Sequence, residues 1–391
     1  MHLIGVIAGT ACLAIWSYLL LLHGGFWKVW RLQAPESPPG TVDGTIAVVI
    51  PARDEADVIG AAVRSLLEQK LVKSIRVFVV DDHSSDGTAQ AARQAAQDCG
   101  RPDSLTVITG RSLPSGWTGK LWAVHQGVQQ AIKLSPDFLL LTDADIIHSS
   151  DNLASLVGVA QAGNYDLASF MVKLHCRSLA ERLLVPPFVF FFFLLYPPNW
   201  IRDPDRNAAG AAGGCMLIRP MVLERAGGFA AIRGAIIDDC ALAKAVKRSG
   251  GRVWLSLTRT ARSDRAYCGF AEIERMVARM AFNQLRHSTL LLIGAIIGMS
   301  LSYLLPLLLI LSDGRTAASL GAIACLLMAA AYAPMVRFYK LNLLWSLTLP
   351  LSACFYMAAT IHSACKFWSG RGGEWKGRVQ DTASVDLKAP S

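Results

Sequence analysis

The stretch Thr45-Ile-Ala-Val-Val-Ile-Pro51-Ala-Arg53-Asp54-Glu55 joins a run of apolar residues to a polar turn. A short apolar run rich in β-branched residues predicts a buried strand, and the pattern from Ala56 onward predicts a helix. The same order returns with Ile75-Arg-Val-Phe-Val-Val80, which is followed by Asp81-Asp82. Strands that alternate with helices in this way predict an α/β fold with parallel strands.

Acidic residues after these two strands predict a nucleotide site. Ligands of parallel α/β sheets bind at the carboxyl ends of the strands, where the loops carry functional side chains. Glu55 and Asp82 are therefore placed to hold the ribose and base of a nucleotide. Either turn alone would be a weak signal, because acidic residues also cap strands and helices, but the two in order are more specific.

A third apolar run, Phe138-Leu-Leu-Leu-Thr142, leads into Asp143-Ala-Asp145. In an extended segment, carboxylates two residues apart point the same way, which suits shared coordination of Mg²⁺ or Mn²⁺. The alternative is a polar strand end followed by a helix cap at Ser149 or Ser150. His148 stands close by, but a single histidine is more often a surface or capping residue.

Small residues precede a later strand, in Asn207-Ala-Ala-Gly210-Ala-Ala-Gly213-Gly214. Glycine lets the backbone approach a ligand closely, so Gly213 and Gly214 are candidates for the part of the site that binds a second substrate, the acceptor. Asp238-Asp239 then precede a helical pattern. A carboxylate at a helix start is often only a cap, but it can also act as a general base that takes a proton from an acceptor hydroxyl.

The composition points to a membrane protein. The chain has 391 residues, of which 53% are hydrophobic, and a formal net charge of +9. Its basic residues are spread out beside apolar segments, which favours a membrane surface over nucleic acid as a partner. The nine cysteines form no CxxC pair, so we expect reduced cysteines without a zinc site or a disulfide framework.

Four apolar stretches, residues 3–22, 289–312, 316–336 and 341–364, predict membrane segments. The first lacks the basic start of a signal peptide, and Lys28 and Arg31 place its C-terminal end in the cytoplasm. A further apolar stretch, residues 183–200, contains four prolines and is expected to be too broken for an ordinary span. We expect it to dip into the membrane or face the acceptor, with a buried hydrophobic segment as the alternative.

The predicted organisation has six parts. They are an anchor at 1–27, a linker at 28–44, an α/β domain at 45–269, an interfacial amphipathic helix at 270–288, membrane segments at 289–364 and a basic tail at 365–391. The interfacial helix is predicted from apolar residues at spacings of three and four beside Arg275 and Arg279. The basic tail and Pro350 predict that 341–364 is re-entrant or interfacial and returns the tail to the cytoplasm. The alternative is a basic tail that lies outside and has no catalytic part.

Taken together, the Pro51 to Glu55 turn, Asp81-Asp82, Asp143-Ala-Asp145 and Asp238-Asp239 resemble glycosyltransferase family 2 in order and spacing. That family has a nucleotide-binding α/β sandwich called GT-A. More narrowly, Gly116-Trp-Thr-Gly-Lys120-Leu-Trp-Ala and the tail Gly373-Glu-Trp375-Lys376-Gly-Arg378 look like the hopene-associated glycosyltransferases of the HpnB type. The resemblance covers nearly the whole chain.

The resemblance implies a role for each matching residue. Pro51, Arg53, Glu55 and Asp82 would line the base and ribose pocket, and Lys120 would reach the diphosphate. Asp143 and Asp145 would hold the metal, and Asp239, the second acid of its pair, would be the base. The Q-x-x-R-W motif of processive members is incomplete here, and Gln284 and Arg286 are the candidate acceptor contacts in its place. The tail residues Trp375, Lys376 and Arg378 would return near the donor site.

The expected function is that of a membrane-bound inverting glycosyltransferase in the bacterial plasma membrane, with its catalytic domain in the cytoplasm. Its partners would be a nucleotide-diphosphate sugar, expected to be a UDP-sugar, and a lipid acceptor, expected to be a hopanoid. The alternatives are another lipid acceptor (ceramide, diacylglycerol, carotenoid or polyprenyl phosphate) and a non-catalytic protein that binds nucleotide sugars.

Overall fold

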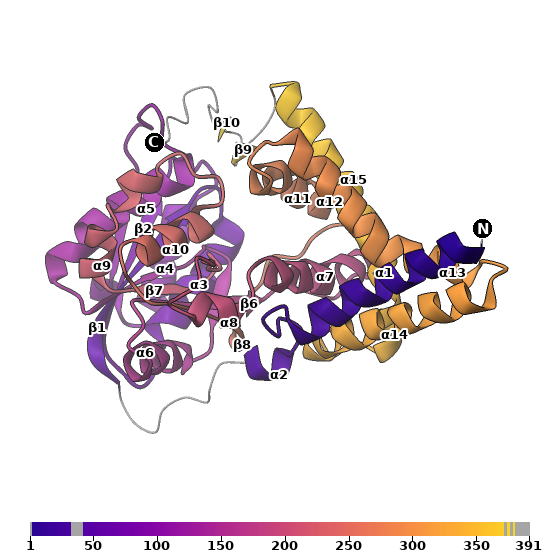
Figure 1. The fold of residues 1–391 in the computed structure, drawn as a ribbon. Helices are drawn as coiled ribbons and strands as arrows, with labels where there is room; N and C mark the ends of the chain where they lie inside the picture. Colours follow the sequence, from indigo (N-terminus) through magenta and orange to yellow (C-terminus); the bar gives the residue numbers. More distant parts are fainter. Residues whose placement is uncertain (1, 33–41, 371–373, 376–377, 380–391) are drawn as a thin grey trace. The chain divides into compact units, whose positions relative to one another are not determined.

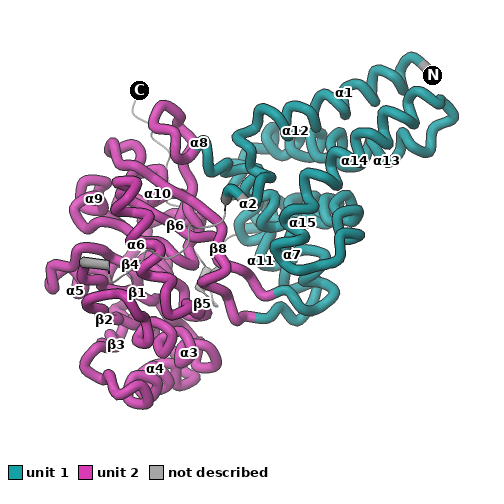
Figure 2. Tube along the Cα trace, turned by 90° about the horizontal axis from the view of Figure 1, so that it is seen from below, with its two compact units in different colours: residues 1–32, 176–200, 266–372 teal, residues 33–175, 201–265, 373–391 magenta. Residues whose placement is uncertain are grey.

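The computed structural model describes residues 2–32, 42–370, 374–375 and 378–379. The chain forms two compact units (Figure 2). The sheet unit contains residues 33–175, 201–265 and 373–391, and the helical unit contains residues 1–32, 176–200 and 266–372. The sheet unit is therefore not continuous in the sequence, since residues 176–200 leave it and belong to the helical unit.

Figure 1 shows the sheet unit as strands surrounded by helices. Its sheet has eight strands in the order β3-β2-β1-β4-β7-β6-β8-β5. Strands β3, β2, β1 and β4 run parallel, whereas β7 is antiparallel to both its neighbours and β5 is antiparallel to β8. This mixed sheet confirms the predicted α/β class. The strands are β1 (Val42–Ala52), β2 (Val72–Asp81), β3 (Leu105–Thr109), β4 (Phe138–Leu141), β5 (Ile146–His148), β6 (Leu167–Lys173), β7 (Met216–Ile218) and β8 (Val253–Ser263).

Helices pack on both faces of this sheet, which explains why the strands are continuous apolar runs. Ile46, Val48 and Ile50 of β1 belong to the core that includes residues of α3, α4 and α6. Val49 points the other way, toward α5, where a side chain on Gly127 would come within 2.5 Å of it. The helices are α3 (Ala56–Leu67), α4 (Thr88–Asp98), α5 (Gly119–Ala131), α6 (Asn152–Ala162), α9 (Pro220–Arg225) and α10 (Asp238–Arg248), with short 3-10 turns η1 (Pro102–Ser104), η2 (Ile132–Leu134) and η3 (Phe229–Ile232).

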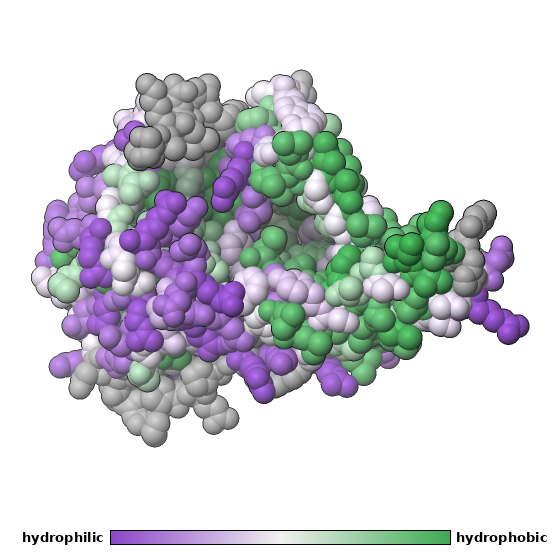
Figure 3. All heavy atoms as spheres, viewed as in Figure 1, coloured by the Kyte–Doolittle hydropathy of each residue, from purple (hydrophilic) through white to green (hydrophobic). Residues whose placement is uncertain are grey.

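The helical unit carries the long apolar helices. Five helical segments of the described residues are long and apolar enough to cross a membrane: Leu3–Leu21, Leu179–Arg202, Thr289–Ile310, Arg315–Phe338 and Leu343–Trp368. Apolar side chains gather on the surface of α1, α12, α13 and α14 (Figure 3). The elements are α1 (His2–Leu21), α2 (Val29–Leu32), α7 (Leu179–Leu195), α8 (Pro198–Arg202), α11 (Phe270–Gln284), α12 (Thr289–Met299), the π-helical η4 (Ser300–Leu304), α13 (Leu305–Ile310), α14 (Arg315–Phe338), η5 (Leu343–Thr348) and α15 (Leu349–Trp368). Two short strands, β9 (Glu374–Trp375) and β10 (Arg378–Val379), follow.

Helix α7 runs unbroken through Pro186 and Pro187. The segment breaks later, where α7 ends at Leu195 before Pro197 and Pro198. At the first pair of prolines, a side chain of α15 replaces one of the lost hydrogen bonds. Pro187 has no N–H to donate to the carbonyl of Leu183, and Ser352 Oγ donates to that carbonyl instead, at 2.8 Å. Tyr356 OH donates to the next carbonyl, that of Leu184, at 2.7 Å.

The sheet nevertheless prevents α7 and α8 from crossing a membrane. The chain enters this segment after β6 and leaves it before β7, and these two strands pair in one sheet. Both ends of the segment therefore lie on the same side of the membrane. Half of its most apolar window is buried inside the protein, as in the alternative of a buried hydrophobic segment.

Helix α11, expected to lie at the interface, runs side by side with α15. Their aromatic rings pair at both ends, Phe270 with Phe355 (ring centroids 6.4 Å apart) and Phe282 with Phe367 (5.5 Å). Ile273 and Val277 of α11 are buried in a cluster with residues of α7 and α15. The apolar side of α11 that the sequence assigned to lipid is therefore covered, in large part, by protein.

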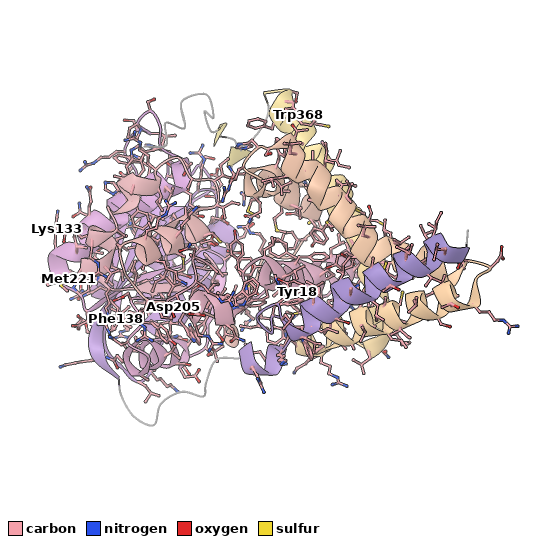
Figure 4. The ribbon with its side chains drawn as sticks, in the orientation of Figure 1. Tyr18, Lys133, Phe138, Asp205, Met221 and Trp368 are labelled. Carbon is pink, nitrogen blue, oxygen red and sulfur yellow. The ribbon has the colours of Figure 1, made fainter. Side chains whose placement is uncertain are left out.

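Pro350 lies in the first turn of α15, where a missing N–H breaks no helical hydrogen bond. The expectation of a bend at Pro350 in the middle of the stretch is therefore wrong, because α15 begins there, directly after the 3-10 helix η5. From there α15 continues to Trp368, which is exposed at its C-terminal end (Figure 4). The side of the membrane on which the tail lies stays a prediction.

Candidate active site

The first part of the candidate site forms where β1 and β2 end side by side. The backbone N–H of Asp82 donates to the carbonyl of Ala52 at 2.8 Å. Arg53 Nη1 donates to the Asp82 carbonyl at 2.7 Å and lies 3.4 Å from its Oδ2. Asp82 is only 2% exposed, so this ion pair is largely shielded from water and holds the two strand ends together.

The turn after β1 is held by the turn after β2. Asp54 has a positive φ of 50°, and its N–H donates to Ser84 Oγ at 3.0 Å. The N–H of Glu55 donates to Thr88 Oγ1 at 2.8 Å. These bonds aim the Glu55 side chain at Arg265, with which it forms an ion pair.

Asp143-Ala-Asp145 forms a turn between β4 and β5, closed by a bond from the Ile146 N–H to the Asp143 carbonyl at 3.3 Å. The expectation of an extended segment is wrong, and the two carboxylates have different partners. Asp143 Oδ1 lies 2.9 Å from Lys120 Nζ. Asp145 Oδ2 accepts from Ser263 Oγ at 2.7 Å and lies 3.5 Å from Arg265 Nε.

Lys120 joins the turn of Asp143 to the acidic start of α10. It is the second residue of α5, whose N-terminus is capped by Thr118. Its Nζ lies 2.9 Å from Asp143 Oδ1 and 3.2 Å from Asp238 Oδ2. Burial by itself lowers the pKa of Lys120, but the carboxylates of Asp143 and Asp238 raise it well above the ordinary value. Lys120 is therefore a permanent cation at the start of a helix, where an anionic ligand is also favoured.

Asp239 is held by two backbone groups. Its Oδ2 accepts from the Gly213 N–H at 2.8 Å, and its Oδ1 accepts from the N–H of Cys240 at 2.7 Å. Burial and the negative charge of Asp238 raise the pKa of Asp239 to about 6, against the lowering effect of Lys120. A carboxyl with this pKa can accept a proton near neutral pH, as a general base must.

Of the two candidate glycines, Gly214 is the more tightly surrounded, whereas a Cβ on Gly213 would make ordinary contacts. A Cβ on Gly213 would lie 3.4 Å from Asp239 Oδ2 and 3.5 Å from Lys120 Nζ. A Cβ on Gly214 would lie 3.1 Å from Val172. A cleft at this place is lined by residues of several elements, including Pro51, Lys120, Asp143, Gly213, Phe229 and Asp238.

Not every predicted site residue lies in the sheet unit. Gln284 and Arg286 are in the helical unit, where Gln284 Oε1 accepts from Tyr196 OH at 2.9 Å and Arg286 is exposed with a φ of 52°. Trp375 and Arg378 belong to the sheet unit, where they lie on the short strands β9 and β10, while Lys376 lies outside the described residues. Their contact with acceptor or donor stays a prediction.

Sequence reasoning missed Arg265 and Ser263 and misjudged His148. Arg265 follows the end of β8, and this strand end beside an acidic residue was the available signal. His148 is neither a surface nor a capping residue: it is 3% exposed, and burial lowers its pKa to about 3. Its Nδ1 accepts from Asn152 at 2.9 Å, so its Nε2 donates to Thr142 Oγ1 at 3.1 Å. Thr142 in turn donates to the Gly214 carbonyl at 2.7 Å, which ties the turn of Asp143 and Asp145 to the backbone of Gly214.

The turn of Asp143 and Asp145 suits a divalent cation that is bound together with a ligand. Glu55, Asp143, Asp145 and Asp238 are bridged by two cations, Lys120 and Arg265, which leaves an excess of two negative charges. The described residues contain no cluster of three or more metal-binding side chains. Mg²⁺ and Mn²⁺ sites commonly use one or two carboxylates and take their other ligands from water and phosphate, so two carboxylates fit.

A mixed α/β sheet with acidic turns at the ends of β1, β2 and β4 defines the class of GT-A nucleotide-sugar transferases. Residues 43–283 match the family described as "Glycosyltransferase like family 2". Since this match covers more than half of the chain, the protein belongs to glycosyltransferase family 2, whose members invert the configuration of the transferred sugar.

Two known proteins are similar to the chain over different lengths. A 4,4'-diaponeurosporenoate glycosyltransferase of Staphylococcus haemolyticus (strain JCSC1435) is 29% identical over 139 residues, which is 36% of this chain and 33% of that protein. The chain thus matches about a third of that relative's length. A mannosyltransferase, PcManGT from Pyrobaculum calidifontis, solved with GDP-Man and Mn²⁺, has a TM-score of 0.54 at 19% identity and covers 93% of this chain and 99% of its own. At this identity the likeness shows the fold.

Proposed function

We propose that this protein transfers a sugar from a nucleotide-diphosphate donor, expected to be a UDP-sugar, to the hydroxyl of a membrane lipid. The observation that carries the proposal is the joint placement of Lys120, Asp143 and Asp238, beside an Asp239 whose raised pKa suits a base. Membrane-length apolar helices in the same chain favour a lipid acceptor over a soluble one.

The donor would lie across the ends of β1, β2 and β4. Glu55 and Asp82 would hold ribose and base, with Pro51 and Arg53 shaping the pocket, and Lys120 would contact the diphosphate. A divalent cation held by Asp143 and Asp145 would supply neutralisation of the charge that develops on the leaving nucleoside diphosphate.

The chain's own residues would carry the proton transfer. Asp239 keeps its carboxylate aimed by the N–H groups of Gly213 and Cys240, and each of its oxygens can accept a further hydrogen bond. The acceptor hydroxyl would give its proton to Asp239 while its oxygen bonds to the anomeric carbon and the bond from that carbon to the diphosphate oxygen breaks. One such displacement inverts the anomeric configuration, in keeping with the family.

We further propose a hopanoid as the acceptor class. The support is the resemblance of residues 116–123 and 373–378 to the hopene-associated type. A carotenoid acid is the competing acceptor, because the similar staphylococcal protein is named for one. We also propose that the sheet unit lies in the cytoplasm of a bacterial cell, beside the plasma membrane, because Lys28 and Arg31 follow α1.

Transfer assays test the proposal directly. Purified full-length protein is incubated with UDP-, GDP- and dTDP-sugars, Mn²⁺ or Mg²⁺ and bacterial lipid extract, and the lipids are read by mass spectrometry. We expect one donor to give a glycosylated lipid, with loss of product in EDTA. A protein that neither transfers nor hydrolyses any of these donors would instead be a non-catalytic nucleotide-sugar binder. Lipid analysis of a deletion strain separates hopanoid from carotenoid acceptors.

A further inference from the structure

Arg265 stands between two acidic side chains that come from distant parts of the sequence. Its Nη2 pairs with Glu55, and its Nε lies 3.5 Å from Asp145 Oδ2. The segment before it is tied to the same aspartate. Ser263 Oγ donates to Asp145 Oδ2 at 2.7 Å, and the Asp264 N–H donates to the Asp145 carbonyl at 3.0 Å.

Arg265 compensates charges that would otherwise repel each other. Glu55 and Asp145 are 12% and 16% exposed, so water screens them weakly. Burial by itself lowers the pKa of Arg265, but Glu55 and Asp145 raise it above the ordinary value, so the guanidinium stays charged. Without a cation between them, two partly buried carboxylates would face each other uncompensated.

The same position conflicts with a metal on Asp145. A Mg²⁺ or Mn²⁺ ion binds carboxylate oxygens at about 2.1 Å, and a guanidinium at the same carboxylate would be repelled by it. A guanidinium displaced from Asp145 has several N–H donors in a planar fork, which suits the oxygens of a diphosphate. Arg265 is 34% exposed, so its side chain can reach a ligand from solvent.

We propose that Arg265 is a displaceable counter-ion: it holds Asp145 and Glu55 in the ligand-free protein and turns to the donor diphosphate when a divalent cation takes Asp145. The proposal rests on the proposed function and adds a residue to its donor site. Arg265 then weakens the binding of a metal ion without donor and strengthens the binding of metal ion and diphosphate together. Metal and donor therefore bind cooperatively, and the metal ion binds weakly when the donor is absent.

The test uses full-length protein in detergent, with Mn²⁺ binding followed by electron paramagnetic resonance and UDP binding by calorimetry. Arg265→Gln is expected to bind Mn²⁺ about tenfold more tightly than wild type without nucleotide, because a like charge is removed. With Mn²⁺ saturating, it is expected to bind UDP about tenfold more weakly. Arg262→Gln is the matched control: it removes the same charge from an exposed residue of β8 and should change neither affinity by more than about twofold.

If Arg265→Gln does not fold, Arg265→Lys decides. It keeps the charge, so Mn²⁺ affinity should stay within about twofold, while UDP affinity should fall several-fold because the planar fork is lost. Unchanged Mn²⁺ and UDP affinities in Arg265→Gln, or unchanged UDP affinity in Arg265→Lys, overturn the proposal. In both cases wild-type protein still binds Mn²⁺ and UDP, so the proposed function survives. A wild-type protein that binds neither overturns both.

Discussion

Asp239 is the residue on which the proposed chemistry depends. An Asn in its place has nearly the same shape, but its amide group cannot take a proton, and its N–H₂ would face the N–H of Gly213 or Cys240. We expect Asp239→Asn to bind UDP nearly as wild type and to lose about a hundredfold or more in kcat. Steady-state kinetics and UDP calorimetry check this. Asp238→Asn is the companion variant: near wild-type turnover in Asp239→Asn with loss in Asp238→Asn assigns the base to Asp238.

Asp145 contributes a negative charge to the proposed metal site. We expect Asp145→Asn to abolish transfer and to weaken Mn²⁺ binding, because an amide lacks the charge that a cation beside a diphosphate needs. Thermal unfolding should show a folded protein, since Ser263 Oγ can still donate to the amide oxygen. Full turnover of the wild-type protein after exhaustive EDTA treatment would contradict the metal's role.

His148 makes stability depend on pH. Burial holds its folded-state pKa at about 3, while the unfolded chain has a value of about 6.5. The unfolded state therefore binds a proton first as the pH falls, so the contribution of neutral His148 is complete above about pH 6.5 and is lost from there toward pH 3. We expect His148→Gln to flatten the fall of the melting temperature between pH 6.5 and pH 4.5. An unchanged pH profile in this variant rules out His148 as the cause.

At the scale of elements, α7 and α15 are joined by a side chain that replaces a missing helical hydrogen bond. Ser352→Ala leaves the Leu183 carbonyl without the donor that Pro187 cannot supply. We expect it to destabilise the protein by about 1–2 kcal/mol, the cost of an unpaired buried carbonyl. Thr360→Val is the matched control on α15, because Thr360 Oγ1 bonds the Tyr356 carbonyl within its own helix. Equal melting temperatures of the two variants in detergent would remove this explanation of the unbroken α7.

The pairing of α11 with α15 also bears on the membrane segments. The two helices run in the same direction side by side, with ring contacts at both ends. If α11 lies along the membrane surface, as Arg275 and Arg279 favour, then α15 lies beside it instead of crossing. This supports the prediction that residues 341–364 return to the side from which they came.

For the whole molecule, this arrangement predicts a cytoplasmic tail. With α1, the α12–α13 segment and α14 as the crossing helices, residues 337–340 and the basic tail both lie inside. In a background without native cysteines, Ser369→Cys and Ser391→Cys should resist an impermeant maleimide in intact cells and react after permeabilisation. Ser312→Cys, in the loop between α13 and α14, should react in intact cells. Labelling of Ser369→Cys in intact cells means that α15 crosses.

The sequence by itself determined the class of fold, the family and most of the acidic site. Apolar strand runs predict buried parallel strands, and the carboxyl ends of parallel strands meet at one edge of the sheet. The sequence therefore predicts that Glu55, Asp82 and Asp143 lie close together. Only the tertiary structure showed which side chains and segments these residues contact. Arg265 meets Glu55 across 210 positions, His148 is buried, and residues 176–200 join the other unit, because pairing across the chain leaves no local period to read. The continuity of α7 at Pro186 and Pro187 could not be predicted for the same reason, since the hydrogen-bond donor to the Leu183 carbonyl comes from a residue 169 positions away.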